Sequence, residues 1–249
     1  MSTFDDLVAV VTGGGDGIGA ACAAEFRARG ARVGVLDLDP GKPSDGILPV
    51  VADVRDGNSL ATAMAEVAEA FGGIDILVNN AGISAVGTVE ANDDDEWHRV
   101  LDVNVVGIAR ASTAALPYLR RSSNGVIVNM SSIAATAGLV QRAVYSASKG
   151  AVHALTLAMA ADLVTEGIRV ACVAPGTVDT PWVGRLLAKS ADPEAERARL
   201  AARQPTGRLV SPAEVAAAVA YLASPAASAT TGTSLAVDGG MSGLRMPRT

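Results

Sequence analysis

Short apolar runs alternate along the chain with longer segments in which apolar residues recur at helical spacing. The short runs are almost continuously apolar, which is typical of strands that are covered on both faces of a parallel sheet. The predicted strands are 7–11, 31–37, 47–52, 74–79, 125–130, 168–174 and 234–237. The predicted helices lie near 17–30, 57–71, 93–121, 144–166 and 211–223. This alternation predicts an α/β fold, a doubly wound parallel sheet of seven strands with helices on both faces.

No linker and no internal repeat divides the chain, so the pattern predicts a single domain over residues 1–249. The sequence Ser211-Pro212-Ala213-Glu214 has the form of a capping box with proline at the first helical position, and it predicts a helix start. The irregular stretch at about 176–209 is rich in Arg, Asp, Glu and Pro. We interpret it as an insertion of mobile helices that forms a lid over a substrate site.

Composition excludes several classes of protein. The chain is 49% hydrophobic with a formal net charge of −6, so it can bury a core but has no excess of positive charge for nucleic acid. Its two cysteines and two histidines lack the spacing of a disulfide framework or a metal site. The N-terminus lacks a cationic signal, and the apolar stretch 151–164 is too short to span a bilayer. We therefore expect a cytoplasmic protein that binds neither nucleic acid nor membrane.

A glycine-rich loop, Thr12-Gly13-Gly14-Gly15-Asp16-Gly17-Ile18-Gly19, follows the first predicted strand. Its glycines permit a tight turn and let a pyrophosphate approach the backbone and the N-terminus of the next helix. The spacing differs by one residue from the commoner dinucleotide-binding fingerprint and by itself is weak evidence. Because the loop follows the first strand of an alternating pattern, we expect it to bind a dinucleotide.

The second predicted strand ends at Asp37. A carboxylate at this place accepts hydrogen bonds from an adenosine ribose and repels a 2′-phosphate. The loop also carries Asp16 rather than a basic residue, so the sequence favours NAD over NADP. The alternative is that Asp37 is a solvated loop acid. Asp53, after the third strand, either hydrogen-bonds the adenine edge or caps a helix.

A phenol and an ammonium lie four residues apart in Tyr145-Ser146-Ala147-Ser148-Lys149, on one face of a predicted helix. A neighbouring cation lowers the pKa of a tyrosine, which suits the phenol to act as a base near neutral pH. Ser131 and Ser132 follow the strand 125–130, where a hydroxyl can bond a substrate oxygen. Each feature alone also fits an ordinary helix surface or a cap.

These features occur together in the order and spacing of one family. The set Thr12-Gly-x-x-x-Gly-x-Gly19, Asn79-Asn80-Ala81-Gly82, Asn104, Ser132, Tyr145-x-x-x-Lys149 and Pro175-Gly176 resembles the classical short-chain dehydrogenases/reductases over essentially the whole chain. The resemblance implies a Rossmann-type fold, an NAD cofactor and interconversion of a secondary alcohol and a ketone by hydride transfer. It also implies a homotetramer, because members of this family are usually tetramers.

The resemblance assigns a role to each motif. Tyr145 would take the hydroxyl proton of the substrate, Lys149 would hold the nicotinamide ribose and lower the pKa of Tyr145, and Ser132 would orient the substrate oxygen. Asn104 would anchor a water that relays the proton outward. The expected cofactor-binding residues are Gly13, Asp16, Gly17, Ile18, Gly19, Asp37, Asp53, Val54, Asn80, Ala81, Gly82, Tyr145, Lys149, Pro175, Gly176, Val178 and Thr180.

The stretches 172–181 and 203–208 resemble the branch of cytosolic type 2 3-hydroxybutyrate dehydrogenase and bacterial 2-keto-3-deoxy-L-fuconate dehydrogenases. By that resemblance Arg142, Arg185 and Arg203 would receive a substrate carboxylate, which a guanidinium binds through paired donors. We expect a small hydroxy acid as substrate, a sugar-derived keto-deoxy acid before 3-hydroxybutyrate. The alternatives are 3-hydroxybutyrate, an uncharged ketone or sugar, and a non-catalytic nucleotide-sensing protein.

Overall fold

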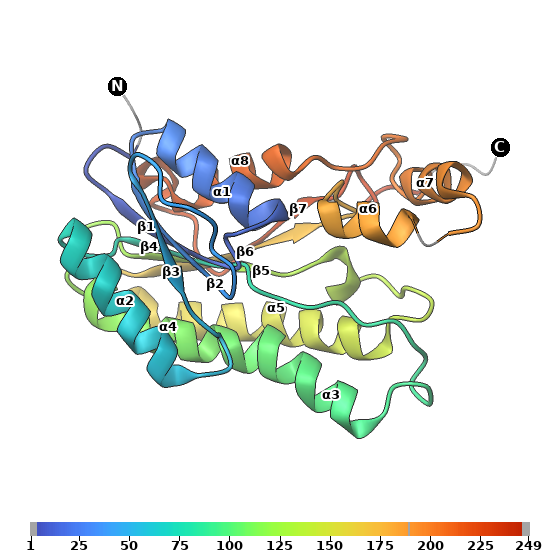
Figure 1. The fold of residues 1–249 in the computed structure, drawn as a ribbon, viewed down its shortest axis with the longest axis horizontal. Helices are drawn as coiled ribbons and strands as arrows, with labels where there is room; N and C mark the ends of the chain where they lie inside the picture. The colour runs from blue at the N-terminus through green and yellow to red at the C-terminus, as the bar shows by residue number, and fades with distance from the viewer. Residues whose placement is uncertain (1–3, 189, 246–249) are drawn as a thin grey trace.

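Seven parallel strands form one sheet in the computed structural model, which describes residues 4–188 and 190–245 (Figure 1). The strands are β1 (Val8–Thr12), β2 (Arg32–Asp37), β3 (Ile47–Val51), β4 (Ile76–Asn79), β5 (Val126–Met130), β6 (Arg169–Pro175) and β7 (Ser234–Val237). Their order is β3-β2-β1-β4-β5-β6-β7, and every neighbouring pair is parallel. The predicted fold class is therefore confirmed. The order reverses between β1 and β4, and the loops that diverge there leave a crevice at the carboxyl ends of the strands.

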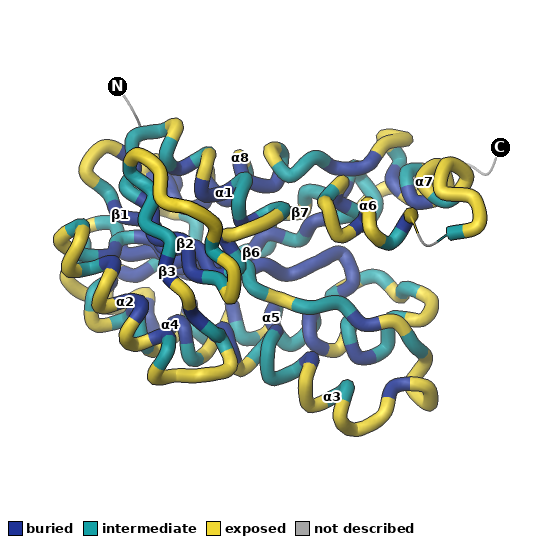
Figure 2. Tube along the Cα trace, viewed as in Figure 1, coloured by how far each residue is buried: buried dark blue, intermediate teal, exposed yellow. Residues whose placement is uncertain are grey.

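Helices cover both faces of the sheet, as Figure 1 shows. On one face lie α1 (Gly17–Ala28) and α8 (Pro212–Ala223), and on the other lie α2 (Gly57–Phe71), α4 (Gly107–Leu119) and α5 (Ala143–Leu163). Alternate strand residues enter the two apolar cores, which explains why the strands are apolar throughout. Figure 2 shows the central strands buried and the outer helices exposed on their far sides.

The predicted helix at 93–121 is divided in the structure. It consists of α3 (Asp94–Leu101), a π-helical segment (Asp102–Val106) and α4. Short 3₁₀ turns lie at Ile133–Ala135, Val164–Glu166 and Pro225–Ala227. None of the helices in the described part of the chain is both long and apolar enough to cross a membrane.

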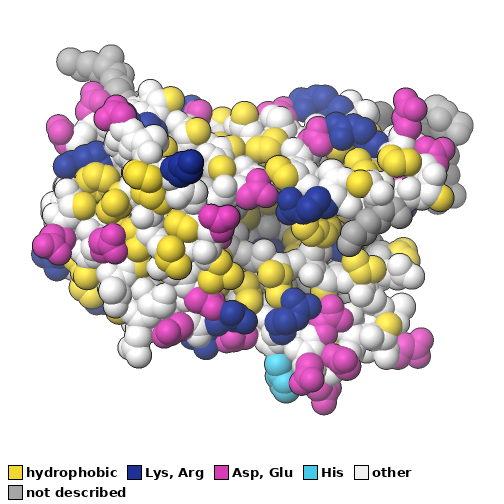
Figure 3. All heavy atoms as spheres, viewed as in Figure 1, with side chains coloured by type: hydrophobic (Ala, Val, Ile, Leu, Met, Phe, Trp, Pro, Cys, Tyr) yellow, Lys and Arg dark blue, Asp and Glu magenta, His cyan; other side chains and the backbone are white. Residues whose placement is uncertain are grey.

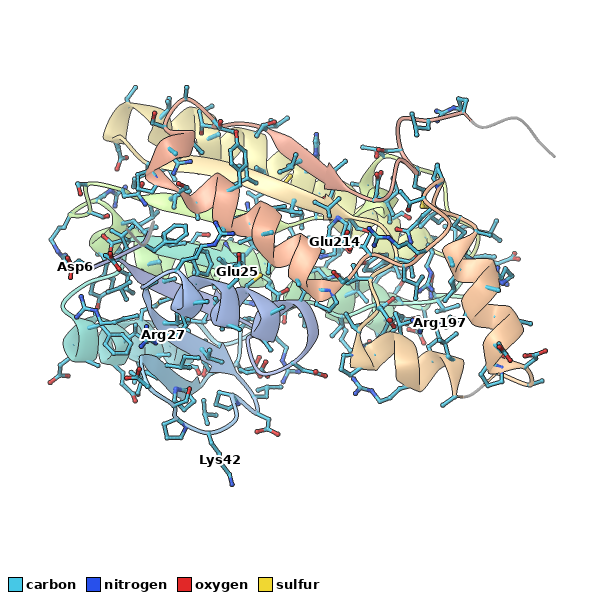
Figure 4. The ribbon with its side chains drawn as sticks, turned by 90° about the horizontal axis from the view of Figure 1, so that it is seen from above. Asp6, Glu25, Arg27, Lys42, Arg197 and Glu214 are labelled. Atoms are coloured by element: carbon cyan, nitrogen blue, oxygen red, sulfur yellow. The ribbon has the colours of Figure 1, made fainter. Side chains whose placement is uncertain are left out.

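The segment predicted to be a lid, 176–209, contains α6 (Pro181–Leu187) and α7 (Pro193–Ala201). It has a small apolar cluster of its own, formed by Val183, Leu187, Leu200 and Leu209, apart from the two main cores. One ion pair joins two parts of this segment, and another ties the segment to α8. Arg197 of α7 pairs with Asp179, and Arg208 pairs with Glu214 at the start of α8; Figure 4 labels Arg197 and Glu214. The segment thus forms a separate layer near the carboxyl ends of the strands.

Candidate active site

A cleft of about 840 Å³ opens at the carboxyl ends of the strands. Figure 3 shows the molecule hollowed between the lid segment and the part that carries α3, with basic side chains on both sides of the hollow. Twenty predicted site residues line the cleft: Gly13, Asp16, Gly17, Ile18, Asp37, Asp53, Val54, Asn80, Ala81, Gly82, Ser132, Arg142, Tyr145, Lys149, Pro175, Gly176, Val178, Thr180, Arg185 and Arg203. The other two, Gly19 and Asn104, are buried beneath it.

The glycine loop is held close to the end of β4 by contacts that leave no room for side chains. A Cβ atom on Gly13, whose φ is +63°, would lie 2.7 Å from Ala81 Cα. A Cβ atom on Gly19 would lie 2.0 Å from Gly13 O. The amide of Asn80 donates to Gly13 O at 2.8 Å and to Thr12 O at 3.1 Å. The resemblance makes Gly19 a cofactor-binding residue, but in the structure it allows α1 to pack against the loop.

The N-terminus of α1 faces open space in the cleft. Asp16 is the N-cap residue, and its carboxylate accepts a hydrogen bond from Gly17 N at 2.7 Å. A Cβ atom on Gly17 would have open space around it. Beyond the adjacent residues and the backbone of α1, the described part of the chain comes within 4 Å of it only at Thr180, at 3.5 Å. The first backbone N–H groups of a helix bind anions, and this opening leaves them accessible. The loop and helix therefore fit the pyrophosphate of a dinucleotide.

Asp37 is held at the end of β2, where the sequence predicts the ribose of the adenosine. Its carboxylate accepts from Gly15 N at 3.0 Å and from Asp39 N at 3.3 Å. These two bonds fix the side chain, and each oxygen keeps a lone pair for a further donor. Asp37 is thus an oriented part of the cleft wall.

Asp53 has a partner that the sequence analysis missed. Its carboxylate receives Arg55 Nη2 at 2.6 Å and Arg55 Nε at 3.0 Å, and these hydrogen bonds hold the pKa of Asp53 below its usual range. The cap of α2 is Asp56, so the alternative in which Asp53 caps that helix is wrong. Arg55 also lines the cleft, two residues after Asp53. Its positive charge is neutralised by the pair, which leaves this end of the cleft without a free cation from Arg55.

Tyr145 and Lys149 lie on α5 beside the end of β5. Lys149 Nζ donates to Met130 O at 2.8 Å and lies 5.9 Å from the centre of the Tyr145 ring. Ser132 follows β5, and its hydroxyl accepts from Ala134 N at 3.1 Å. The structure thus brings three of the four predicted catalytic side chains, Ser132, Tyr145 and Lys149, to the same cleft.

The pKa of Tyr145 shifts in the direction opposite to the sequence prediction. Burial raises it, while a hydrogen bond to Ser132 and the positive charge of Arg142 oppose the rise. Burial also lowers the pKa of Lys149 to about 8, because the charged ammonium loses water. Sequence spacing predicts the effect of a neighbouring cation but not the desolvation of both groups.

Asn104 lies in the π-helical segment and joins two parts of the site. Its Oδ1 accepts from Ile83 N at 2.8 Å, and its Nδ2 donates to Ile83 O at 2.9 Å and to Ser148 Oγ at 3.0 Å. Ser148 Oγ donates in turn to Tyr145 O at 2.8 Å. A π-helical turn redirects the following side chains, and such turns are frequent at functional sites. Here it accompanies a buried link between the loop after β4 and α5.

Two of the three predicted substrate arginines, Arg142 and Arg203, line the cleft close enough for the charge of one to act on the other. Arg142 Nη1 donates to Ser84 Oγ at 3.0 Å and to Ala85 O at 2.9 Å, which fixes it at the start of α5. The pKa of Arg203 is lowered by burial, then by the charge of Arg199, with a further contribution from Arg142. Neither Arg142 nor Arg203 forms an ion pair with any carboxylate in the described ranges.

The third arginine, Arg185, lies elsewhere. Its Nη2 is 3.8 Å from Asp16 Oδ2, so α6 brings it to the phosphate loop. Apolar side chains that the sequence analysis did not single out also line the cleft, among them Leu139, Leu186 and Leu200. They come from separate loops and helices, so no local motif marks them. Within the described ranges, no three His, Cys, Asp or Glu residues lie together as a metal site.

The chain is similar to several known proteins along most of its length. A family described as enoyl-(acyl carrier protein) reductase matches residues 13–242. The chain is 42% identical to cis-4-hydroxycyclohexanecarboxylate dehydrogenase of Sinomonas cyclohexanicum, over 95% of this chain and 97% of that protein. It is 45% identical to inactive 2-(S)-hydroxypropyl-CoM dehydrogenase 2 of Xanthobacter autotrophicus, over 78% of this chain and 85% of that protein.

A solved structure has the same fold over its full length. The ligand-free aldohexose dehydrogenase of Thermoplasma acidophilum superposes with a TM-score of 0.92 and is 37% identical, covering 99% of both chains. The similarity therefore includes the lid segment as well as the sheet and the helices that cover it.

The position of Lys149 predicts an unusual titration. In the free protein its amine should lose its proton near pH 8 rather than near 10.5, because it is buried. The unfolded chain then binds more protons between these two values, so the contribution of Lys149 to stability should rise as pH rises through this window. Nitrogen-15 NMR of labelled lysines measures the midpoint directly, since the sequence has three lysines.

Two substitutions assign the NMR signal to Lys149. Lys149→Arg should remove the signal that titrates near pH 8, and Lys42→Arg, at a lysine that points away from the molecule in Figure 4, should leave it. A Lys149 midpoint near 10.5 would contradict the prediction.

Proposed function

The chain belongs to the classical short-chain dehydrogenases/reductases, a family of oxidoreductases, and on that premise we propose that it is an NAD-dependent dehydrogenase of a small hydroxy acid. It would interconvert a secondary alcohol and a ketone. The observation that supports this best is the meeting of Ser132, Tyr145 and Lys149 in one cleft with Arg142 and Arg203. The first three suit proton transfer at a hydroxyl, and the two guanidiniums suit a carboxylate.

The cleft offers a place for each part of the cofactor. The loop at Gly13–Gly17 and the N-terminus of α1 would hold the pyrophosphate, and Asp37 would hold the adenosine ribose. Lys149 and the segment at Pro175–Gly176 line the part of the cleft next to Tyr145, where the nicotinamide end would lie. When bound, NAD supplies the hydride acceptor.

The chain itself supplies proton transfer and orientation. Tyr145 would take the proton of the substrate hydroxyl, and Ser132 would donate a hydrogen bond to the substrate oxygen. The Ser132 hydrogen bond and the Arg142 charge both favour the phenolate, since both lower the pKa of Tyr145. Below about pH 8 Lys149 is charged, and an ammonium 5.9 Å from the centre of the Tyr145 ring would also favour the phenolate. The phenol would thus become a useful base once the site is closed and charged groups surround it.

The inner cleft favours an anionic substrate with an apolar body. Arg142 is held in place and Arg203 comes from the lid segment, so a carboxylate between them would neutralise two like charges. Leu139, Leu186 and Leu200 offer no hydrogen bonds to sugar hydroxyls. This lining favours a compact hydroxy carboxylate over the keto-deoxy sugar acid that the sequence resemblance suggests. One relative is named for a substrate of that kind, a hydroxycyclohexanecarboxylate.

An uncharged sugar is the second candidate substrate. It is supported by the similarity to an aldohexose dehydrogenase over 99% of both chains. The two candidates differ in charge, so a panel of hydroxy carboxylates and uncharged sugars, followed by the absorbance of reduced nicotinamide, separates them.

Replacing Arg203 tests the carboxylate. Arg203→Gln should raise KM for a hydroxy carboxylate by about ten- to a hundredfold, the loss of one charge-assisted hydrogen bond. It should leave the kinetics of an uncharged alcohol nearly unchanged. The control is Arg120→Gln at the end of α4, an exposed arginine paired with Glu166, which should change neither. Wild-type turnover of uncharged sugars equal to that of the best hydroxy acid would remove the carboxylate from the proposal.

Replacing Tyr145 tests catalysis itself. Tyr145→Phe removes the phenolic oxygen and should lower kcat by about 10²- to 10⁴-fold, the usual contribution of a positioned base. Dinucleotide affinity measured by calorimetry should stay near the wild-type value. Tyr118→Phe, on α4, serves as the control and should keep full activity. Full activity in Tyr145→Phe would refute Tyr145 as the base, and no turnover in the wild type with any substrate would favour the nucleotide-sensing alternative.

Replacing Asp37 tests the cofactor. The wild type should prefer NAD, and Asp37→Ala should reduce that preference because the carboxylate no longer binds the ribose or repels a 2′-phosphate. The ratio of kcat/KM for the two cofactors measures it, with exposed Asp39→Ala as the control. A wild-type preference for NADP would refute the NAD assignment.

A further inference from the structure

A row of polar side chains crosses the buried sheet near its carboxyl edge. Asn79 of β4 is in register with Asn129 of β5, Asn129 with Cys172 of β6, and Cys172 with Ser234 of β7. Residues in register on neighbouring parallel strands project from the same face. The residues two positions earlier on these strands, Leu77, Ile127 and Val170, belong to the apolar core beneath α4 and α5. Because side chains two residues apart on a strand share a face, the polar row also faces α4 and α5.

Hydrogen bonds connect this row to both helices. Asn79 Nδ2 donates to Asn129 Oδ1 at 2.9 Å and to Ser112 Oγ of α4 at 3.1 Å. Asn129 Nδ2 donates to Thr156 Oγ1 of α5 at 3.0 Å, and the Thr156 hydroxyl donates to Val152 O at 2.8 Å. All four side chains are buried. Buried hydrogen bonds of this kind fix geometry strongly, since breaking one leaves an unpaired polar group without water.

Thr156 lies on the face of α5 that carries Lys149. The two residues are seven apart, which is about two helical turns, so their side chains project in nearly the same direction. Lys149 Nζ donates to Met130 O, and Thr156 accepts from Asn129, the residue before Met130 on β5. The end of β5 thus holds α5 at two points along the helix.

The sequence of α5 explains why a directional bond is useful there. The helix, AVYSASKGAVHALTLAMAADL, contains many alanines and one glycine, so it offers few large side chains to interlock with the sheet. Apolar contact is non-directional and opposes separation more than sliding along the axis. A hydrogen bond has a narrow range of distance and angle, so it fixes the axial position as well.

We propose that Thr156 is a positioning residue whose hydroxyl, held by Asn129, fixes the axial position of α5 and thereby of Tyr145 and Lys149 relative to Ser132. Asn129 lies within β5 and Ser132 follows β5. The same strand therefore positions both α5, through Asn129, and the hydroxyl of Ser132. The expected effect of Thr156 on turnover rests on the proposed function. The expected effect of Thr156 on the position of Lys149 does not depend on turnover.

The test compares two variants, each of which removes the hydrogen bond that joins the polar row to one of the two helices. Thr156→Val keeps the shape of the side chain and removes the hydroxyl, which breaks this attachment of α5 and leaves the Lys149 attachment in place. Ser112→Ala removes the bond from Asn79 to α4 and leaves α5 untouched. Both should lower the melting temperature, and Thr156→Val should lower it more, because it also removes the bond to Val152 O. Thr156→Ser restores the hydroxyl and should restore the wild-type behaviour.

Thr156→Val should lower kcat by about ten- to a hundredfold, as a displacement of about 1 Å does, with little change in the KM for NAD. It should also shift the nitrogen-15 titration midpoint of Lys149 in the free protein. Ser112→Ala should leave both at wild-type values. If Thr156→Val does not fold, Thr156→Ala makes the same comparison.

Equal effects of the two variants on Lys149 and kcat, or no effect of either, would overturn the proposal and leave Thr156 a structural residue. The Lys149 measurement separates this failure from that of the proposed function. A wild type without turnover on any substrate would refute the dehydrogenase, while the contrast between the two variants in the Lys149 spectrum would still decide the role of Thr156.

Discussion

The site depends on one buried amine. Lys149 is 5% exposed and donates to Met130 O at 2.8 Å, so a single main-chain carbonyl is the hydrogen-bond partner described for a group that prefers to be charged and hydrated. The desolvation of this amine accounts for its low pKa of about 8. The hydrogen bond to Met130 O holds the amine beside the Tyr145 ring, at the part of the cleft where β5 ends. Moving either α5 or β5 would break this arrangement.

The end of β5 therefore organises much of the site. Two positions of β5 and the residue after it bond to α5. Asn129 donates to Thr156, Met130 accepts from Lys149, and Ser131 Oγ donates to Lys149 O at 3.2 Å. Ser132 then enters the cleft. One strand end thus fixes the helix that carries the phenol and also presents the hydroxyl that faces it. This explains how a helix rich in small side chains can hold reacting groups in place.

The acidic and the basic side chains of the cleft come from different parts of the chain. The acids Asp16 and Asp37 come from the first half of the sheet, while Arg142 and Arg203 come from α5 and the lid segment. This distribution fits the proposed ligand pair, in which NAD would lie along the first half of the sheet and an anionic substrate would lie near Arg142 and Arg203. Arg185 spans the two regions, since it belongs to the lid but lies near Asp16.

The sequence by itself determined the seven strands, the glycine loop and the pair Tyr145 and Lys149, because these depend on local periodicity and on spacing within a few residues. It also determined the family, because several such motifs occur in one order along the chain. Only the tertiary structure decided the π-helical turn at Asn104, the Arg55 partner of Asp53 and the place of Arg185. It also reversed the expected direction of the Tyr145 pKa shift. Each of these depends on which distant groups meet and on how much water they exclude, and residue spacing along a single chain does not specify either.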